Sequence, residues 1–344
     1  FNIFRPFKMA PELLAVVVVA IAAIPTAYTG ASGIFVIAVG GLIYAELRRA
    51  GARRQLALAA TAMSGSLGVV LRPCLLVVII AALNNEVTTD QLFGWGVKVF
   101  LLTTVLFAGI PLLTGRNSIR MEKPTVALPE FIQALKPLIP YIVIIGLTLA
   151  VYGLALNAWL DEFSAPFILP VLLLVILIYE RAAQEKGLLK RENINIEYVE
   201  NRLEKSWDDL RDGNDSIEKT IREATTETTG HIGALLMLMG LSVSIGGVVE
   251  RAELMSMVPT TFESVWLAMA LLVALLVVIG MVMDPYGAVI LVSATIASIA
   301  YDSGIHPVHF WMVTLVAFEL GYLSPPVALN HLLTRQVVGE EEVR

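Results

Sequence analysis

The chain has 344 residues, of which 57% are hydrophobic and 16% charged, with a formal net charge of −6 and a mean hydropathy of +0.76. Soluble domains average about 45–50% apolar and about 25% charged residues, so this composition indicates an integral membrane protein and does not favour nucleic-acid binding. The single cysteine, Cys74, excludes an internal disulfide framework and a cysteine metal site, and the absence of a Gly-rich phosphate loop argues against direct ATP hydrolysis. We therefore expect no enzyme and no cofactor.

Apolar stretches that match or approach the roughly 20 residues needed to cross a bilayer recur along the chain. They are Leu13–Tyr28, Ile34–Ala45, Leu56–Leu83, Val97–Leu113, Leu138–Leu160, Ala165–Tyr179, Ile232–Val249, Val265–Met283, Ala288–Ala300 and Phe310–Leu333. The third is broken at Ser64–Gly68 and Arg72-Pro73, and the last is broken at Gly321–Pro326. The sequence predicts an all-α, multi-pass membrane protein. Because the chain starts at Phe1 without a signal peptide, we expect that an N-terminal stretch precedes it.

Lys and Arg are concentrated in loops that counting of the spans places on one side of the membrane. These loops are Glu46–Arg54, Gly115–Lys136 and Arg181–Glu227, whereas Asn84–Trp95 has neither residue and carries Glu86 and Asp90. Cytoplasmic loops carry the basic excess, so the first three are predicted to be cytoplasmic. The dense mixed charge of Arg181–Glu227 favours a solvated connector, and a docking surface for a partner subunit is the alternative.

Two parts of the chain follow the same order of apolar arm, Gly-rich break, apolar arm and broken helix. With an offset of 253 residues, three pairs of Gly or Pro positions coincide: Gly51 with Gly304, Gly68 with Gly321 and Pro73 with Pro326. The loop Glu46–Arg54 is arginine-rich, whereas its counterpart Ile299–Pro307 has no Lys or Arg, so the two parts are predicted to be inverted in the membrane. Inverted repeats with interrupted segments are typical of secondary transporters.

This pattern predicts four parts. They are a first repeat at 1–95 (the first region), scaffold and connecting helices at 96–180, the cytoplasmic connector at 181–228, and a second repeat at 229–344 (the second region). In each repeat a hairpin precedes the broken helix. We interpret Leu13–Ala45 and Val265–Ala300 as re-entrant hairpins with tips at Thr29–Gly33 and Met283–Gly287; full spans joined by tight turns would give the same charge pattern.

Interrupted helices expose backbone groups that can bind ions. Free N–H groups at a helix N-terminus favour an anion, and free carbonyls at a C-terminus favour a cation. The breaks also supply hydroxyl oxygens, which are hard ligands suited to sodium: Thr29, Ser32, Ser64, Ser66 and Ser324.

Three charged residues lie within or beside apolar segments. Asp284 is predicted to serve an ion site, with a helix N-cap before Pro285 as the alternative. Arg72 could bind a substrate carboxylate, or pair internally or reach the headgroups. For Glu319 we favour the interpretation as a buried, hydrogen-bonded carboxylate, and a role in coupling or proton transfer is the alternative.

At these residues the chain resembles the large membrane subunit of TRAP transporters (tripartite ATP-independent periplasmic transporters). The second-half motifs carry most of the resemblance: Gly280–Asp284, Gly304–Phe310 and Gly321–Val327. The first half matches more loosely, at Thr29–Gly33 and Gly68–Cys74, and the family's first helices are missing. Arg72, Cys74 and Ala328 depart from the family pattern, which has proline, serine and glycine there.

The resemblance implies an elevator-type importer of small carboxylates in the cytoplasmic (inner) membrane of a bacterium or archaeon, driven by sodium. It also implies a periplasmic substrate-binding protein and a small membrane subunit as partners. The implied sodium-site residues are Gly30, Ser32, Gly33, Ser64, Ser66, Gly68, Asp284, Gly287, Gly321, Ser324 and Pro325. The residues expected to contact substrate are Thr29, Ser32, Arg72 and Asp284. A single-component sodium/carboxylate carrier and a non-transporting membrane scaffold are the alternatives.

Overall fold

The computed structural model describes residues 3–30, 32–115, 121–122, 124–155, 157, 159, 164–185, 265–325 and 328–339, with scattered residues between 186 and 264. Regular structure in these residues is entirely helical and includes no strand, which confirms the predicted all-α class. Five of the helices are long and apolar enough to cross a membrane, or six if one bent pair counts as a span. The protein is therefore a multi-pass membrane protein. Most of the connector Arg181–Glu227 and of the segment Ile232–Val249 lies outside the described residues.

The first region forms a helical hairpin followed by a broken helix. Its elements are α1 (Pro11–Thr29), α2 (Ser32–Arg49), α3 (Arg54–Met63), the 3-10 turn η2 (Leu67–Val70) and α4 (Leu75–Leu83). The chain from Arg54 to Val70 is bent by 41° against α4, so the predicted break is confirmed. Gly30 ends α1 with φ +62, a left-handed conformation that glycine adopts without a Cβ penalty.

The middle of the chain differs from the prediction at two places. Helix α5 (Thr89–Thr114) begins well before Val97, because Thr88 and Gln91 form a capping box that starts the helix within a polar stretch. Helix α6 (Pro124–Leu135) lies in what was predicted to be the loop Gly115–Lys136. It is followed by η3 (Lys136–Leu138), α7 (Ile139–Ala150), the π-helical turn η4 (Val151–Ala155) and α8 (Ala165–Glu185).

The second region has the same order of elements. Helices α11 (Val265–Val282) and α12 (Pro285–Asp302) form a hairpin, and α13 (Pro307–Leu323) and α14 (Leu329–Val338) are the halves of the second broken helix. Ala328 adopts a left-handed φ of +47 immediately before α14. The predicted interruption at Gly321–Pro326 is confirmed, since α13 ends at Leu323 and α14 starts at Leu329.

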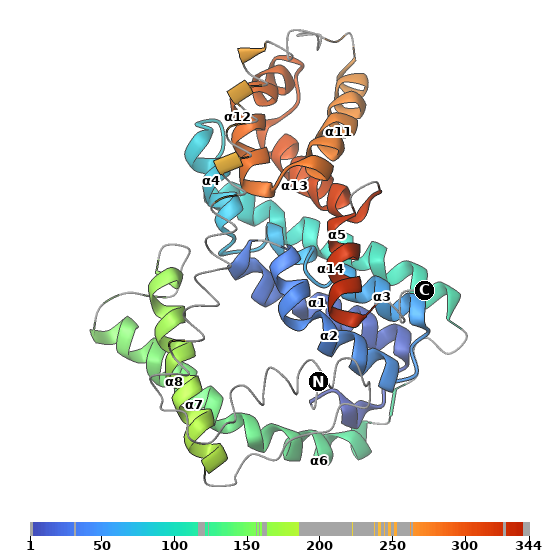
Figure 1. Cartoon of the computed structure of the whole chain (residues 1–344), viewed down its shortest axis with the longest axis vertical. Coiled ribbons are helices and arrows are strands. Elements are labelled where there is room, and N and C mark those ends of the chain that lie inside the picture. Colours follow the sequence, from blue (N-terminus) through green and yellow to red (C-terminus); the bar gives the residue numbers. More distant parts are fainter. Residues whose placement is uncertain are drawn as a thin grey trace.

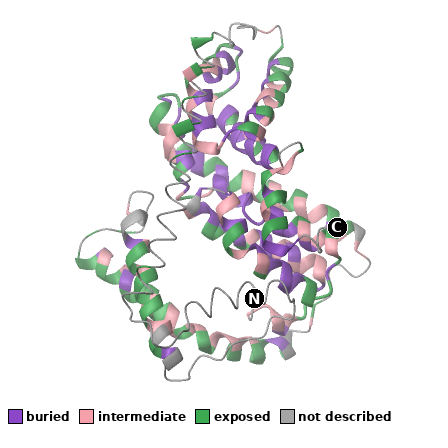
Figure 2. Cartoon of the chain, viewed as in Figure 1, coloured by how far each residue is buried: buried purple, intermediate pink, exposed green. Residues whose placement is uncertain are grey.

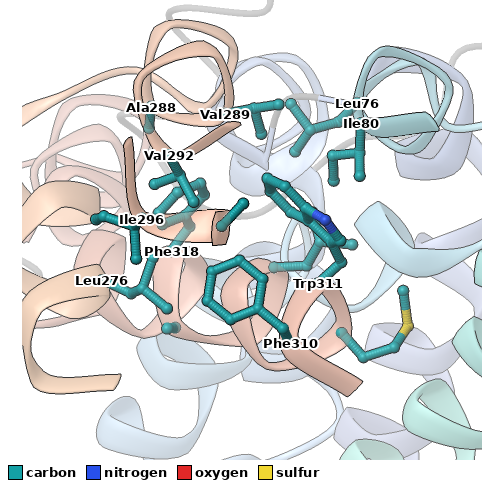
Figure 3. Close-up of a cluster of buried hydrophobic side chains, with 14 of the residues drawn as sticks. Leu76, Ile80, Leu276, Ala288, Val289, Val292, Ile296, Phe310, Trp311 and Phe318 are labelled. Carbon is teal, nitrogen blue, oxygen red and sulfur yellow. The ribbon is translucent and has the colours of Figure 1, made fainter. Parts of the chain in front are cut away.

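Each broken helix leaves its own hairpin at the break and packs against the other hairpin. Helices α3 and α13 lie against α1 and α11 of their own regions, whereas α4 packs against α12 and α14 packs against α2. Figure 3 shows Leu76 and Ile80 of α4 in one core with Val289, Trp311 and Phe318 of the second region. Val337 and Val338 of α14 belong to the other core, with the first hairpin. This exchange brings the breaks together where the two regions cross.

Burial separates the helices into two groups (Figure 2). In the span Pro285–Asp302 half of the residues are buried, whereas in Thr89–Leu113 and Ala127–Ala155 only 11% are. The exposed residues of α5 include Leu106, Ile110 and Leu113, an apolar surface suited to lipid contact. Figure 1 shows α7 and α8 away from the main bundle. Helix α5 instead packs against α1, η2 and α13, so it contacts both regions.

Candidate functional site

A buried group of polar side chains joins the two regions where they cross. Asn330 Nδ2 donates hydrogen bonds to Ser32 Oγ at 3.4 Å and to Ser66 Oγ at 3.3 Å. The Glu319 carboxylate lies beside the hydroxyls of Ser32 and Ser66. All four residues are buried, and Asn330 is completely so. We refer to Ser32, Ser66, Glu319 and Asn330 as the polar node. It combines two hydroxyls of the first region with a carboxylate and an amide of the second.

Secondary structure explains why these side chains meet. Ser32 begins α2 and Ser66 lies between α3 and η2, while Glu319 is in the last turns of α13 and Asn330 in the first turn of α14. Helices α3 and α13 both end beside the node. The last carbonyl groups of an α-helix have no hydrogen-bond partner within that helix. The negative ends of the α3 and α13 dipoles lie near the node, as do the positive ends of the α2 and α14 dipoles, so the helix dipoles by themselves do not select the sign of a bound ion.

The two hairpin tips also meet. A Cβ added at Gly30 would lie 3.1 Å from Tyr286 Oη and 3.5 Å from Cys74 Sγ, so the first tip touches the start of α12 and the break before α4. A larger residue than glycine would have to displace Tyr286. The predicted site residue Gly30 is therefore adjacent to the second tip, although it is 253 residues or more from it in the chain.

A close helix contact made by Gly68 has a counterpart at Gly321. A Cβ at Gly68 would lie 2.3 Å from Ala23 O and 2.8 Å from Ala27 N of α1. A Cβ at Gly321 would lie 2.8 Å from Val277 O and 2.7 Å from Gly280 C of α11. Both glycines thus allow a broken helix to touch the backbone of the first arm of its hairpin, which is the packing role of these two predicted residues.

Asp284 caps α12. Its Oδ1 accepts hydrogen bonds from Tyr286 N at 2.9 Å and Gly287 N at 3.2 Å, as in the alternative reading of this residue. Its Oδ2 is buried and has no hydrogen-bond partner among the described residues. In that part of the chain, Glu319 Oε2 is the only other buried side-chain nitrogen or oxygen atom without a partner. Capping uses one oxygen and leaves the other available to a ligand, so the ion-site role stays a prediction.

The other predicted site residues line the breaks without joining the node. Ser64 is buried and donates to Thr61 O at 2.7 Å. Gly33 faces Leu333, whose Cδ1 would be 2.8 Å from an added Cβ. Ser324 and Pro325 follow α13, and Pro325 is exposed. Thr29 ends α1, and its side chain lies outside the described residues.

Arg72 lies apart from the node. Its Nη2 donates to Asp90 Oδ1, and its guanidinium carbon is 5.0 Å from the centroid of the Phe93 ring. The side chains of Arg72 and Asp90 are 49% and 86% exposed. The structure therefore shows the internal pair that was the alternative for Arg72, and its role in binding substrate stays a prediction.

Two residues of the node were missing from the sequence-based site. Glu319 was singled out but interpreted as a buried, hydrogen-bonded carboxylate; its burial is confirmed, whereas its Oε2 has no hydrogen-bond partner among the described residues. Asn330 was not noticed. The offset of 253 residues pairs Glu319 with Ser66 and Asn330 with Val77. The counterpart of Asn330 in the first region is therefore an apolar residue, which gives no hint of a polar site.

The sequence of the chain matches a known protein family and several of its members. Residues 10–343 match the family model described as "Tripartite ATP-independent periplasmic transporter, DctM component". The C4-dicarboxylate TRAP transporter large permease proteins DctM of Vibrio cholerae and Pseudomonas aeruginosa are each 23% identical to the chain, covering 90% and 91% of it respectively. The isethionate TRAP transporter permease protein DctMQ of Oleidesulfovibrio alaskensis is 25% identical over 31% of the chain.

The chain spans 66% of the length of the first two relatives. Its family match nevertheless covers both hairpins and both broken helices. The family consists of transporter components, which agrees with the expectation that the chain is not an enzyme. From the sequence match and the helical architecture together, we conclude that the chain belongs to the DctM component family of tripartite ATP-independent periplasmic transporters.

Proposed function

We propose that this chain is the large membrane subunit of a secondary importer of small organic acids, in which a sodium gradient drives uptake. The observation that carries the proposal is the convergence of helix breaks from both regions on one buried polar node. Irregular backbone at membrane depth is tolerated where it is enclosed by protein or lines a wet cavity, and transporters use such breaks to bind substrate and coupling ion. A purely structural membrane scaffold would not need them.

The relatives support the choice of substrate class. Two of them are named as C4-dicarboxylate permeases and one as an isethionate permease, so all three carry small organic anions. We propose small carboxylates as the substrate of this chain and dicarboxylates as the first compounds to test. The positive end of the α12 dipole lies at its N-terminus and would attract a carboxylate, although Tyr286 N and Gly287 N already donate to Asp284 Oδ1. The Asp284 carboxylate beside it would favour a cation.

In the mechanism that we propose, sodium orders the hairpin tips and thereby completes the anion site. The two regions form an inverted repeat, and the hairpins and broken helices move together against a frame that includes α7 and α8, as an elevator. The packing of α5 against both regions supports assigning it to the moving part rather than to the frame. A periplasmic binding protein would deliver the substrate, a small membrane subunit would complete the frame, and the basic loops would face the cytoplasm across the inner membrane.

Uptake into proteoliposomes tests this function. The full-length subunit and its small partner would be reconstituted, and radiolabelled dicarboxylates offered with and without an inward sodium gradient and the cognate binding protein. The proposal predicts uptake only when both are present. Sodium-driven uptake without the binding protein would indicate a single-component carrier, and no uptake under any condition would leave the scaffold interpretation.

A further inference from the structure

A cavity with three basic residues in its lining lies at the end of the first hairpin that is opposite the tip. It has a volume of about 320 Å³ and lies between the 3-10 turn η1 (Arg5–Phe7), the start of α1 and the end of α2. Figure 1 shows the N-terminal end of the chain between α2 and α6. The lining consists of Phe4, Arg5, Lys8, Met9, Leu14, Glu46, Arg49 and Ala50. None of these residues belongs to the polar node, to a hairpin tip or to a helix break, so the cavity is separate from the candidate transport site.

One buried carboxylate holds the two arginines of the cavity in place. Glu46 is 6% exposed, and its Oε1 accepts hydrogen bonds from Arg5 Nη2 at 2.8 Å and from Arg49 Nη1 at 2.7 Å. Arg5 Nε also donates to Glu46 Oε2 at 3.4 Å. The two guanidinium groups therefore lie side by side on one carboxylate. Because each group is planar and already positioned, binding an anion there requires little further ordering of the side chains.

The charges around the cavity favour an anion. The three basic side chains Arg5, Lys8 and Arg49 pair with two acidic ones, Glu46 and Glu122, so this group carries a net formal charge of +1. Lys8 Nζ lies 3.3 Å from Glu122 Oε2, but the lysine side chain is 67% exposed, so solvent screens this pair. The side chains of Arg5 and Arg49 are 35% and 34% exposed and thus reach solvent. An anion that enters the cavity can therefore meet two positioned guanidinium groups and an accessible ammonium group.

The cavity lies at a surface of the membrane. The apolar span of α1 begins at Pro11 and α2 ends at Arg49, so the open end of the hairpin lies at a bilayer surface whether the hairpin is re-entrant or spans fully. Helix α6, which contacts η1, exposes the apolar residues Leu128 and Ile132. In the orientation proposed above, this surface faces the cytoplasm. Anionic lipids give the cytoplasmic leaflet a negative potential, and basic pockets between helices on that side bind lipid headgroups.

The lining of the cavity combines charged and apolar side chains in a way that suits a phospholipid. Guanidinium groups bind phosphate oxygens through paired hydrogen bonds, and a lysine adds a point charge. Phe4, Met9 and Leu14 supply apolar surface in the same cavity, which a free phosphate ion would not use. The volume is at the lower end of the roughly 300–1,000 Å³ of small-molecule sites, so the cavity accommodates a headgroup and leaves the acyl chains in the bilayer.

We propose that this cavity binds the phosphate headgroup of an anionic phospholipid through Arg5, Lys8 and Arg49. The apolar part of the lining contacts the first carbons of the acyl chains. Since η1 also contacts α6, the bound lipid ties the open end of the first hairpin to η1 and α6 at the membrane surface. The site goes beyond the proposed transport function and does not depend on it, because its residues lie outside the polar node and the helix breaks.

Lipid-dependent thermal unfolding of the purified, delipidated full-length subunit tests the proposal without transport. Phosphatidylglycerol would be titrated into the detergent micelles, with phosphatidylcholine as the zwitterionic control and inorganic phosphate in a separate titration. A ligand that binds the folded state raises its stability with concentration, which gives an apparent dissociation constant. Arg49→Gln and Lys8→Gln each remove one positive charge from the cavity. Arg53→Gln is the matched control, because it removes a charge from the same basic loop but outside the lining.

We expect phosphatidylglycerol to stabilise the protein saturably. Arg49→Gln should raise its dissociation constant about tenfold, the factor that corresponds to the loss of a hydrogen bond to a charged group. Lys8→Gln should raise it several-fold, and Arg53→Gln should leave it unchanged. Arg49→Gln also weakens the contact with Glu46; if that variant does not fold, Lys8→Gln decides, because the pair of Lys8 is exposed and contributes little to stability.

Three outcomes would overturn the proposal. They are an unchanged dissociation constant in the cavity variants, an equal increase in Arg53→Gln, and stabilisation by phosphatidylcholine equal to that by phosphatidylglycerol. Inorganic phosphate that stabilises the protein as strongly as phosphatidylglycerol does would overturn the assignment to a lipid and indicate a site for free phosphate.

Discussion

The close contact between α13 and α11 gives a quantitative prediction. A Cβ at Gly321 would lie 2.7 Å from Gly280 C, 2.8 Å from Met281 N and 2.8 Å from Val277 O. These are backbone atoms, so no side-chain rotation can relieve the clash and the helices must separate. Overpacking of this kind typically costs about 1–3 kcal/mol. An opposing gain of up to about 1 kcal/mol comes from replacing glycine by alanine within a helix.

A control variant removes that opposing gain from the comparison. Gly94 lies within α5, and an added Cβ there would meet no atom within 4 Å. The difference in unfolding free energy between Gly321→Ala and Gly94→Ala should therefore report the clash alone, with Gly321→Ala less stable by about 1–3 kcal/mol. Reversible unfolding in mixed micelles measures both variants. Equal stability of the two would refute the inference that Gly321 permits the close approach of α13 to α11.

Three further predictions concern named contacts. Glu46→Gln should lower the unfolding free energy by about 1–3 kcal/mol, because it weakens the hydrogen bonds that two arginines donate to a buried charge. Unfolding at low and high salt measures this loss, and an unchanged stability would contradict the prediction. Asp90→Ala should change stability by less than about 1 kcal/mol, because its pair with Arg72 is exposed; a larger loss in thermal unfolding would count against this. Trp311→Phe should remove the hydrogen bond from Trp311 Nε1 to Tyr301 Oη at 2.8 Å and should also leave a cavity, because Trp311 is completely buried. A double-mutant cycle with Tyr301→Phe should isolate a coupling energy of about 1 kcal/mol for the bond; additive losses would exclude it.

Much of the fold could be predicted from local patterns. Uninterrupted apolar runs predicted α1, α11 and α12, and glycine and proline within such runs predicted the breaks in both broken helices. The polar start of α5 and the whole of α6 escaped prediction, because each lies in a stretch whose charged residues resemble a loop. The capping box at Thr88 was the available signal for the start of α5.

The candidate site was predictable only in part. Ser32 and Ser66 were identified because hydroxyls at helix breaks have a recognisable chemistry. Asn330 was missed because it lies after the break, within a helix whose sequence shows no reason for a buried amide. Arg72 was assigned to substrate because a charge in an apolar run suggested a ligand, yet its partner Asp90 lies 18 residues away at the start of α5.

The sequence by itself determined that the chain is helical and membrane-embedded and that two of its helices are interrupted. These properties depend on hydropathy, on the conformational freedom of glycine and on the missing N–H of proline, all of which are local. Only the tertiary structure decided that α4 and α14 exchange between the hairpins, and so which side chains meet at the breaks. The hydrogen bond from Asn330 to Ser66 joins residues 264 positions apart in the sequence, and packing alone brings them together.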